Sequence, residues 1–407
     1  MPIDVRTVPT EDLPAIFDLV EWAFGGDPDP DDYATFQALV EPGRTLAAYD
    51  DGVLAGSGAV RTFDMTVPGG PVPAAGVTGV GVSAAHRRRG VLRALMHRQL
   101  SDVREQGTEA FATLTASESS IYARFGYGTA SRRWMTTVDA HDPVLTGRSP
   151  EGRARIVDPV EMRAVAPRIY DAYRPTRPGF LSRNDARWTW RFGDPPSRRH
   201  GASSTRHVLY EVGGEPRGYA WYRTKPDWVD ATPRGNVQVK EMVALDADAS
   251  GGLWRFLLGV DLMTSVSHST IAPDDPVWHR LRNPRVARHT IADGLWVRLL
   301  DVPKALTTRS YLASARTTIE VVDEVGGWAA GRWTLDASPD GATCEPAAWA
   351  SPDLTLSVEE LGAVYLGDTS LRVLHEAGRV DEHTPGAVDA ASRLFAWDRS
   401  AWCPEIF

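Results

Sequence analysis

The sequence predicts a mixed α/β protein built from three domains. Its 407 residues are enough for two or three domains at about 150 residues each. Clusters of Pro, Gly and polar residues at 141–153 and 299–311 mark two linkers. Strand-like and helix-like segments alternate in the stretches that these linkers separate. We therefore expect domains over residues 1–145, 150–300 and 305–407.

The composition is that of a folded globular protein with an acidic balance. Hydrophobic residues make up 43% and charged residues 24% of the chain, unlike a disordered sequence. The net charge of -9 argues against nucleic-acid binding, which needs a cationic excess, and favours a cationic substrate. Neither an export signal nor an apolar run long enough to span a membrane is visible, so we expect a soluble, cytoplasmic protein.

Cysteine and histidine usage argues against disulfides and metal sites. Cys344 and Cys403 are the two cysteines, which excludes a disulfide framework and a four-cysteine zinc site. The histidines show no metal-ligand spacing, so we expect no bound metal.

The first domain is expected to begin with an amphipathic helix over 11–24, with Thr10 as its N-cap. Two strands joined by an Asp-Asp-Gly turn follow, which is a strong hairpin pattern. A third strand then leads through a charged, glycine-containing loop into a second helix and a further strand. The expected bounds of these later elements are strands 45–49, 53–61 and 76–82, helix 91–105 and strand 110–115.

The second domain repeats this order in part, and the third resembles a small α+β module. Where the first domain has its basic loop, the second has Asp246-Ala247-Asp248, which would repel a phosphate. In the second domain we expect strands 207–211, 217–223 and 237–245 and a helix 253–263. In the third domain we expect strands 317–322, 331–335 and 342–346 and helices 357–365 and 384–395.

The strongest functional signal is the loop His86-Arg87-Arg88-Arg89-Gly90 between a strand and a helix. Exposed amides at a helix N-terminus attract anions, and adjacent guanidinium groups add charge-assisted hydrogen bonds. This arrangement predicts a pyrophosphate-binding site. On these residues alone, a solvated basic turn that opens an ordinary helix remains the alternative.

The strand, the Arg-x-x-Gly loop and the helix together resemble the acetyl-CoA-binding motif of the GCN5-related N-acetyltransferases (GNAT). Arg87 or Arg88, with Gly90, matches this motif, whereas Leu92 stands where the family commonly has Gly or Ala. Downstream, residues 117–128 contain Ile-Tyr-Ala-Arg-Phe-Gly-Tyr-Gly and resemble the later family segment in which a Tyr precedes a Phe-Gly-Tyr-like turn.

Over its whole length the chain resembles one subgroup, the enhanced intracellular survival (Eis-like) acetyltransferases. The run Ile-Tyr-Ala-Arg-Phe-Gly-Tyr-Gly and the aromatic last residue are the more specific markers. Members have two fused GNAT-like domains followed by a sterol-carrier-protein-like domain, form hexamers and acetylate amines, including those of aminoglycosides. The resemblance implies this fold, acetyl-CoA as co-substrate, a homo-hexamer and N-acetylation of cationic small molecules.

The same resemblance assigns two catalytic groups. Tyr122 is expected to protonate the leaving thiolate, and the C-terminal carboxylate of Phe407 to act as base or orienting group. Core packing and a frayed chain end are the structural alternatives, although Trp402, Ile406 and Phe407 are apolar anchors for the tail. Tyr127 is expected to be a packing residue. The expected cofactor-binding residues are Val80, Gly81, Val82, Arg87, Arg88, Arg89, Gly90, Val91 and Leu92.

Aromatic and acidic side chains are expected to bind a polycationic amine. Each of them can instead serve helix-end solvation or core packing. Cys403 is expected to be a bystander, because direct transfer needs no acyl-enzyme. The candidate substrate-binding residues are Phe24, Asp27, Phe36, Asp293 and Glu405, with Asp29 as a further acidic candidate.

The predicted function is direct transfer of acetyl from acetyl-CoA to an amine, by proximity and proton management. Two other functions stay open: acetylation of protein lysines, and a CoA- or lipid-binding protein whose GNAT-like domains are scaffolds. The intact basic loop and Tyr122 argue against an inert first domain.

Overall fold

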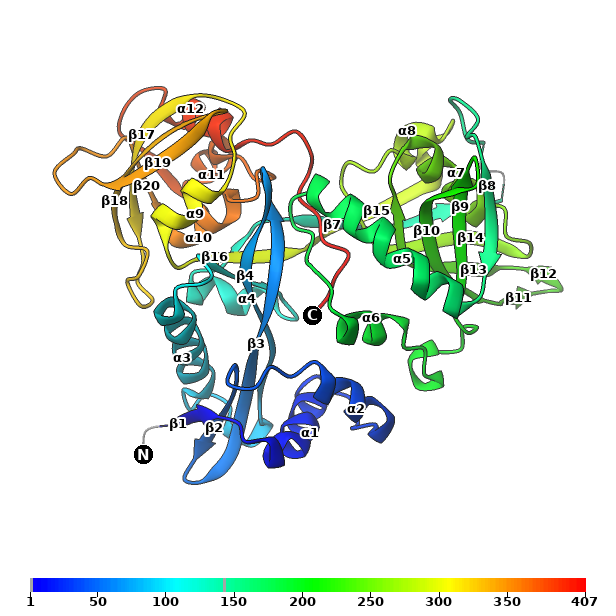
Figure 1. The fold of residues 1–407 in the computed structure, drawn as a ribbon, viewed down its shortest axis with the longest axis horizontal. Coiled ribbons are helices and arrows are strands. Elements are labelled where there is room, and N and C mark those ends of the chain that lie inside the picture. The colour runs from blue at the N-terminus through cyan, green and yellow to red at the C-terminus, as the bar shows by residue number, and fades with distance from the viewer. Residues whose placement is uncertain (1–2, 142–143) are drawn as a thin grey trace.

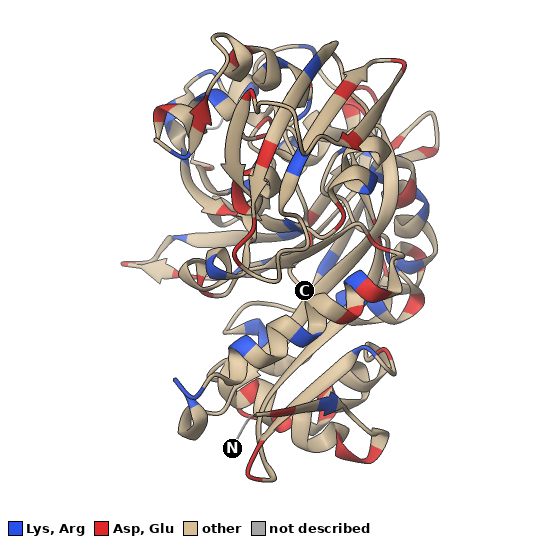
Figure 2. Cartoon of the chain, turned by 90° about the vertical axis from the view of Figure 1, so that its left-hand side faces the viewer, with Lys and Arg blue, Asp and Glu red and all other residues tan. Residues whose placement is uncertain are grey.

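The computed structural model describes residues 3–141 and 144–407. It consists of three lobes, each built around one β-sheet (Figure 1). Two of these sheets have seven strands and the third has five, which confirms the predicted mixed fold. No helix in the described ranges is long and apolar enough to cross a membrane. Basic and acidic residues are interspersed over all three lobes (Figure 2).

The first sheet has the strand order β1-β2-β3-β4-β5-β16-β6. Its β2/β3 turn holds Asp51 and Gly52 at positive φ, as the hairpin pattern predicts. Helix α3 covers the sheet with Val91, Leu95 and Val103, which recur at helical spacing and are buried. The elements are β1 (Asp4–Thr7), α1 (Leu13–Ala23), α2 (Pro30–Ala38), β2 (Thr45–Asp50), β3 (Val53–Val67), β4 (Gly70–Val82), α3 (Val91–Gln106), β5 (Phe111–Thr115), α4 (Ser119–Tyr122), β6 (Gly128–Thr129) and β16 (Leu295–Leu299).

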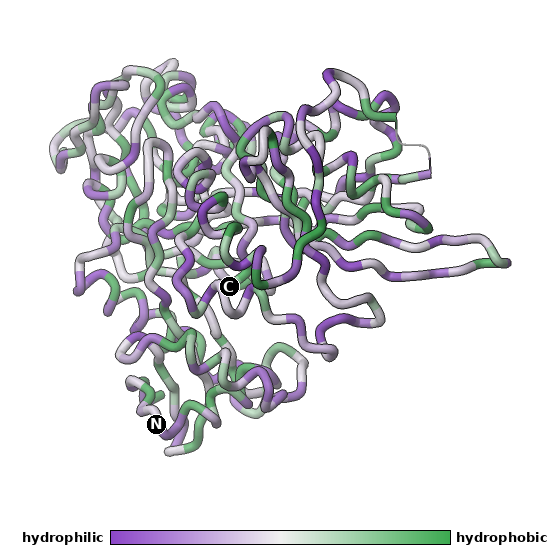
Figure 3. The backbone as a smooth tube through the Cα atoms, turned by 45° about the vertical axis from the view of Figure 1, so that its right-hand side comes forward, coloured by the Kyte–Doolittle hydropathy of each residue, from purple (hydrophilic) through white to green (hydrophobic). Residues whose placement is uncertain are grey.

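The second sheet has the strand order β15-β7-β14-β13-β10-β9-β8. Helices α5 and α7 pack into two separate apolar clusters against it. An arm made of β11 (Trp228–Val229) and β12 (Thr232–Pro233) extends away from this lobe (Figure 3). The other elements are β7 (Arg132–Asp139), β8 (Arg153–Val157), α5 (Pro159–Tyr173), α6 (Asp185–Phe192), β9 (Arg206–Val212), β10 (Glu215–Lys225), β13 (Gly235–Ala244), α7 (Ala247–Leu258), β14 (Met263–Ile271), α8 (Val277–Arg280) and β15 (Ala287–Asp293).

The first two sheets exchange one strand each. Strand β7 follows β6 in the chain but pairs with β14 and β15 in the second sheet. Strand β16 follows β15 but inserts between β5 and β6 in the first sheet. The two crossing segments lie together, with Gly294 N–H donating to Ser131 O at 2.9 Å. Neither of the ranges 1–145 and 150–300 therefore encloses a complete sheet.

The third lobe is a five-stranded sheet, in the order β19-β18-β17-β20-β21, that shares a core with the first lobe. One apolar cluster joins Phe111 and Leu299 of the first sheet to Leu335, Leu354 and Phe395 of the third lobe. The interior of the third lobe is thus filled by its own side chains and those of its neighbour. Its elements are α9 (Val302–Thr308), β17 (Ala315–Val322), β18 (Gly331–Ser338), β19 (Gly341–Pro346), β20 (Leu354–Ser357), α10 (Val358–Val364), α11 (Leu371–Glu376), β21 (Val380–Glu382) and α12 (Ala387–Phe395).

Two local predictions are wrong. Thr10 is not the N-cap of α1, because a 3-10 turn over Thr10–Asp12 comes first and the helix itself starts at Leu13. The helix expected over 253–263 begins earlier and ends at Leu258, because the Asp246 carboxylate accepts a hydrogen bond from Ala249 N–H and so caps its start.

The last residues of the chain leave the third lobe and run between the other two (Figure 1). Arg177 donates a hydrogen bond to Ser400 O at 2.7 Å, and Trp402 N–H donates to Pro178 O at 2.9 Å. Trp402 is buried and serves as the predicted anchor, whereas Ile406 is 50% exposed and does not. The tail therefore connects all three lobes at their common centre.

Candidate active site

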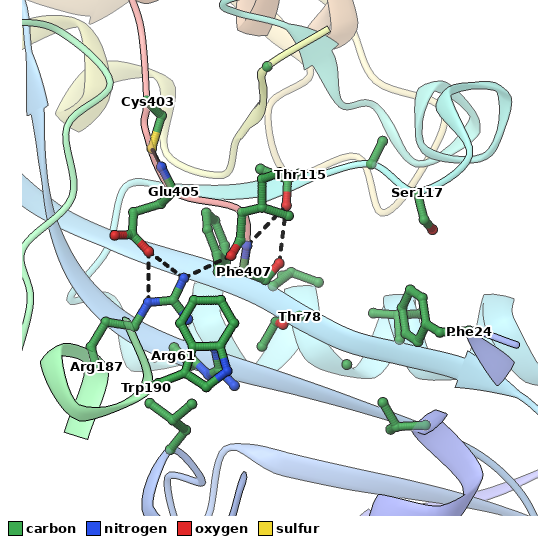
Figure 4. Close-up of a pocket in the computed structure, with 18 of the residues that line it drawn as sticks. Phe24, Arg61, Thr78, Thr115, Ser117, Arg187, Trp190, Cys403, Glu405 and Phe407 are labelled. Carbon is green, nitrogen blue, oxygen red and sulfur yellow. Dashed lines mark hydrogen bonds and ion pairs between the residues drawn. The ribbon is translucent and has the colours of Figure 1, made fainter. Parts of the chain in front are cut away.

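A cavity of about 470 Å³ lies where the tail meets the first two lobes. Its walls come from α1, α2, β3, β4 and the end of β5 in the first lobe, and from α6 and the strand-exchange segments. The end of the tail forms a further wall (Figure 4). The cavity is thus assembled from segments that are distant in the sequence.

Strands β4 and β5 separate at this cavity. They pair in parallel only at Ala75 with Ala112 and at Gly76 with Thr113, and Val77–Val80 and Thr115–Ser117 then line opposite sides of the opening. A bulge in β4 accompanies the separation, with Gly79 at φ +58°. Backbone groups of β4 that face the opening are not paired with β5, so an extended ligand with amide groups, such as pantetheine, fits between the strands.

The N-terminus of α3 is open beyond the end of β4. Gly90 precedes it at φ +87°, and within the described residues no side chain caps the helix. A second cavity of about 660 Å³ lies between α1 and the end of β4, lined by α1 residues, among them Asp18, and by Val82 and Arg87. The two cavities therefore follow β4 in succession, from Phe407 to the basic loop, and the donors at the loop suit a pyrophosphate.

The matching helix of the second lobe is closed to anions. The Asp246 carboxylate accepts a hydrogen bond from Ala249 N–H at 2.8 Å and so fills the position that a phosphate would take at the N-terminus of α7. A cavity of about 500 Å³ beside it is lined by Asp246, Asp274 and Asp275 and by Arg177 and Arg399. The occupied helix N-terminus, with the Asp246 carboxylate on it, therefore opposes the binding of a pyrophosphate.

The structure places the expected cofactor-binding residues unevenly. Val80 lines the cavity at the strand separation, and Val82 and Arg87 line the second cavity. Arg89 forms an ion pair with Asp50 at 2.9 Å, so its charge is already engaged within the protein. The other expected residues serve the local backbone or the core. Gly81 packs against α1, and Arg88 and Gly90 take positive φ where the chain turns into α3. Val91 and Leu92 are the first residues of α3 and pack into the core.

Tyr122 lies at the end of α4 and lines the cavity. Its side chain is 7% exposed, and its ring packs edge-on against Tyr127 with centroids 6.1 Å apart. Burial, and to a smaller extent the charge of Glu118, raise the pKa of the Tyr122 hydroxyl. Tyr127 is fully buried, which confirms its packing role.

Phe407 lies directly across the strand opening. Thr115 Oγ1 donates to a carboxylate oxygen of Phe407 at 3.1 Å and accepts from its N–H at 3.3 Å (Figure 4). The Phe407 ring packs on Phe63 with centroids 5.1 Å apart, in a space that exists because Gly76 has no side chain. The family resemblance predicts that the C-terminal carboxylate of Phe407 lies in the active site. The contacts of Phe407 with Thr115 and Phe63 were not predicted from the sequence.

Glu405 does not offer a free negative charge. Its carboxylate accepts from Arg183 Nε at 2.5 Å and from Arg187 Nε at 2.8 Å, and it is 2% exposed. Burial alone would raise the pKa of Glu405, but the charges of Arg183, Arg187 and Arg191 outweigh it and hold the pKa well below its usual range. The expected role of Glu405 in binding a cation is thus replaced by a role in fixing the tail.

The remaining residues expected to bind the amine substrate fall into two groups, those that line the cavity and those that do not. Phe24, Phe36 and Asp293 line the cavity, and Asp293 accepts a hydrogen bond from Trp296 Nε1 at 2.7 Å. Asp27 is exposed and does not line it. Asp29 caps α2 by accepting from Asp31 N–H at 3.0 Å, so its carboxylate serves the helix.

Several lining residues were missed by the sequence reasoning. Arg61, Arg133, Arg187 and Trp190 contribute to the cavity wall. Three of them come from the second lobe or from a strand exchanged with it, where no motif marks them. The four-residue spacing of Arg183, Arg187 and Arg191 is the signal that could have indicated a buried ionic cluster, although Arg183 precedes the first residue of α6.

Cys403 also lines the cavity, and burial raises the pKa of its thiol to about 12. It stays protonated at neutral pH and is a poor nucleophile. Within the described residues, no group of three or more His, Cys, Asp and Glu is placed to hold a metal ion.

Known proteins match this chain over nine-tenths or more of its length. An uncharacterized N-acetyltransferase of Streptomyces avermitilis is 40% identical over 414 residues, covering all of both chains. The N-acetyltransferase Eis of Mycobacterium tuberculosis is 34% identical over 391 residues, which is 91% of this chain and 92% of the relative. The crystal structure of Eis1 from Mycobacterium abscessus matches all of both chains with a TM-score of 0.85 at 29% identity.

Three family models match the chain in the order of its three lobes, although the second match includes β16, which pairs in the first sheet. An acetyltransferase (GNAT) domain model matches residues 4–130, a second matches 179–299, and a sterol carrier protein domain model matches 302–404. Fold and site together define an N-acetyltransferase of the GNAT class, for which acetyl-CoA is the co-substrate. The chain belongs to the Eis family of GNAT N-acetyltransferases, which confirms the resemblance found in the sequence.

Proposed function

We propose that this enzyme acetylates a primary amine of a cationic small molecule, of the aminoglycoside type, by direct attack on the thioester of acetyl-CoA. The observation that carries the proposal is the meeting of three features at one cavity: the separated strands β4 and β5, the Tyr122 hydroxyl and the end of the chain at Phe407. Phe24, Phe36 and Asp293 on the same wall support binding of an amine.

Tyr122 is the general acid in this proposal. As the amine nitrogen bonds to the carbonyl carbon and the carbon–sulfur bond breaks, its hydroxyl donates a proton to the departing thiolate sulfur. The nitrogen loses one proton to water or to the Phe407 carboxylate as the amide forms, and a proton taken back from water returns the Tyr122 phenolate to its neutral form. Burial favours the neutral phenol, so Tyr122 holds its proton throughout the neutral range.

The Phe407 carboxylate is the base or orienting group. A carboxylate with an ordinary pKa of about 3.5 is a weak base toward an ammonium, so it acts through a water molecule or by aligning the amine. Thr115 and Phe63 support this role because they fix the last residue beside the strand opening.

Acetyl-CoA consumption by the purified protein tests the proposal across polyamines, aminoglycosides and lysine-containing peptides, with product masses recording the number of acetyl groups added. Turnover of small amines supports it. Turnover of peptides alone supports protein-lysine acetylation instead. Binding of acetyl-CoA without turnover of any amine would favour the scaffold function and contradict the proposal.

The homo-hexamer remains a prediction from the family resemblance, and the cytoplasmic location remains a prediction from the sequence. Light scattering on the purified protein, with a mass compared to the 44.5 kDa of one chain, tests the assembly directly.

A further inference from the structure

A short segment of the second lobe, residues 177–181, lies between the first sheet and the tail of the chain. On one side it pairs with β3, where Gly179 N–H donates to Thr66 O at 2.7 Å. On the other side, Trp402 N–H donates to Pro178 O at 2.9 Å. The segment therefore connects the tail to the same sheet that carries the opening between β4 and β5.

Gly179 is the residue of this segment that the tail approaches most closely. It has a φ of +97°, and a Cβ atom at this position would lie 2.9 Å from Trp402 O and 3.2 Å from Trp402 N. A side chain here would strain the backbone and push the tail away, because positive φ favours glycine. The Trp402 ring also packs on Phe180, with centroids 5.3 Å apart.

An ion pair holds the tail just before Trp402. Arg177 Nη1 lies 2.7 Å from Asp274 Oδ1 and donates a hydrogen bond to Ser400 O, also at 2.7 Å. Asp274 Oδ2 accepts a hydrogen bond from Ser400 N–H at 3.2 Å. The two charged side chains, which we call the clasp, thus hold both backbone polar groups of one tail residue. Because the Arg177 side chain is 4% exposed, water screens this pair less than a surface ion pair.

The clasp lies at the strand opening of the second lobe. Strands β13 and β14 pair in parallel only as far as Val239 with His268. Beyond this point they line the cavity of about 500 Å³, together with Arg177, Asp274 and Trp402. The tail therefore passes the strand opening of the second lobe before it ends at the strand opening of the first (Figure 1).

We infer that Arg177 and Asp274 are positioning residues for acetyl transfer: by holding Ser400 they set the place of the Phe407 carboxylate. Both line the cavity of the second lobe, and neither lines the active-site cavity, so they act through the tail. The inference rests on the proposed function, in which this carboxylate is the base or orienting group. It gives the second lobe a task in catalysis although its own anion position is closed.

Arg177→Gln tests the inference by removing the charge of the clasp. We expect kcat to fall by about tenfold, because a small displacement of a catalytic group is costly even when the mutation is distant. The KM for acetyl-CoA should stay unchanged, because β4 and the basic loop are untouched.

The matched control is Arg223→Gln in the same lobe. The Arg223 side chain is 6% exposed and pairs with Asp194, which lies outside the tail. This control should lose a comparable unfolding free energy and keep its kcat. An equal fall of kcat in both variants would overturn the inference, because the effect would then be a general loss of structure.

Digestion of the native protein by carboxypeptidase A measures the hold on the tail without acetyl transfer. This protease removes aromatic C-terminal residues, and mass spectrometry records the loss of Phe407. We expect Arg177→Gln to lose Phe407 several-fold faster than the wild type and Arg223→Gln to lose it at the wild-type rate. Asp274→Ala tests the same clasp if Arg177→Gln does not fold, since the Asp274 side chain is 33% exposed. Equal release from all folded variants would overturn the inference.

A chain extended by Gly-Ser after Phe407 separates this inference from the proposed function. The extension already displaces the carboxylate, so Arg177→Gln should lower kcat no further in the extended chain. A second tenfold fall there would overturn the inference, because the clasp would then act on something other than the carboxylate. If the extension alone leaves kcat unchanged, the proposed role of Phe407 fails, and the carboxypeptidase rates still decide whether the clasp holds the tail.

Discussion

At the scale of single residues, Tyr122 combines a buried position with a side chain that lines the cavity. Because burial raises its pKa, we expect its acid form to persist above the ordinary value of 10.0. A profile of kcat against pH should therefore show no loss that belongs to Tyr122 below that value. An alkaline limb near pH 8 that disappears in Tyr122→Phe would contradict this.

Tyr122→Phe removes the proton donor and keeps the ring that packs on Tyr127. General acid catalysis typically contributes about a hundredfold or more, so kcat should fall by about that factor. Calorimetry should show unchanged CoA binding, because the strand opening and the basic loop are untouched. Unchanged turnover would remove Tyr122 from the mechanism.

Glu405 is predicted to stabilise the fold by its pairs with Arg183 and Arg187. Glu405→Gln leaves Arg187 without a charge partner and Arg183 with Glu241 alone, which costs about 3 to 5 kcal/mol of unfolding free energy. Urea unfolding at pH 7 measures this loss. The control Glu376→Gln changes an exposed carboxyl of α11 and should have little effect.

The contribution of these Glu405 ion pairs to the free energy of unfolding is expected to depend on pH. The pKa of Glu405 is lowered in the folded state, so its contribution is complete above the ordinary value of 4.5 and is lost as the pH falls below it. The stability difference between wild type and Glu405→Gln should therefore shrink in acid. A difference that grows on acidification would contradict the ion-pair account.

Sequence reasoning was strongest where the chemistry is local. Tyr122 and Arg87 belong to contiguous motifs, and both line cavities along β4. It was weak where the role of a residue depends on a distant contact. The sequence suggests that Glu405 is a free acid, but in the folded chain Arg183 and Arg187 form hydrogen bonds with its carboxylate. No local pattern shows which charges will be paired.

At the scale of elements, α3 and α7 occupy matching places but differ at their first turn. Arg87→Gln should raise the KM for acetyl-CoA several-fold, because a charge near the open N-terminus of α3 is lost. Steady-state kinetics with varied acetyl-CoA measure it. An unchanged KM would place the phosphates elsewhere.

Asp246→Ala is the counterpart in α7. It removes a helix cap and should cost about 1 kcal/mol of unfolding free energy without changing the KM for acetyl-CoA. A raised KM in this variant would show that the second lobe takes part in cofactor binding.

The elements with clear periodicity were predicted well, and those that depend on context were not. Strands 53–61 and 237–245 and the helix 91–105 correspond to β3, β13 and α3 within a few residues, apart from the longer end of β3. The bulge at Gly79 was missed, because the separation of β4 from β5 that accompanies it is set by the neighbouring strand.

At the scale of the whole molecule, we expect one acetyl-CoA-binding site per chain. Calorimetric titration of CoA should give a stoichiometry of one, because Asp246 fills the anion position in the second lobe. Two equivalent sites would contradict the assignment of the second lobe as a domain without an anion site.

The exchange of β7 and β16 could not be predicted from the sequence. The residue pattern of β7 or β16 does not show which sheet the strand joins, and the contact between Ser131 and Gly294 that accompanies the crossing forms only in the folded chain. This exchange brings Arg133 and Asp293 to the cavity wall. The part of the cavity wall formed by these residues therefore depends on the packing of the first two lobes and not on one sequence motif.

The central claim is that all three lobes build one acetyl-transfer site, with the tail of the third lobe placed in the first. Extending the chain by a Gly-Ser dipeptide after Phe407 moves the carboxylate away from Thr115 and tests this most directly. We expect kcat to fall by about tenfold or more, with CoA binding and unfolding free energy unchanged. Full acetyl transfer by the folded, extended protein would contradict the account.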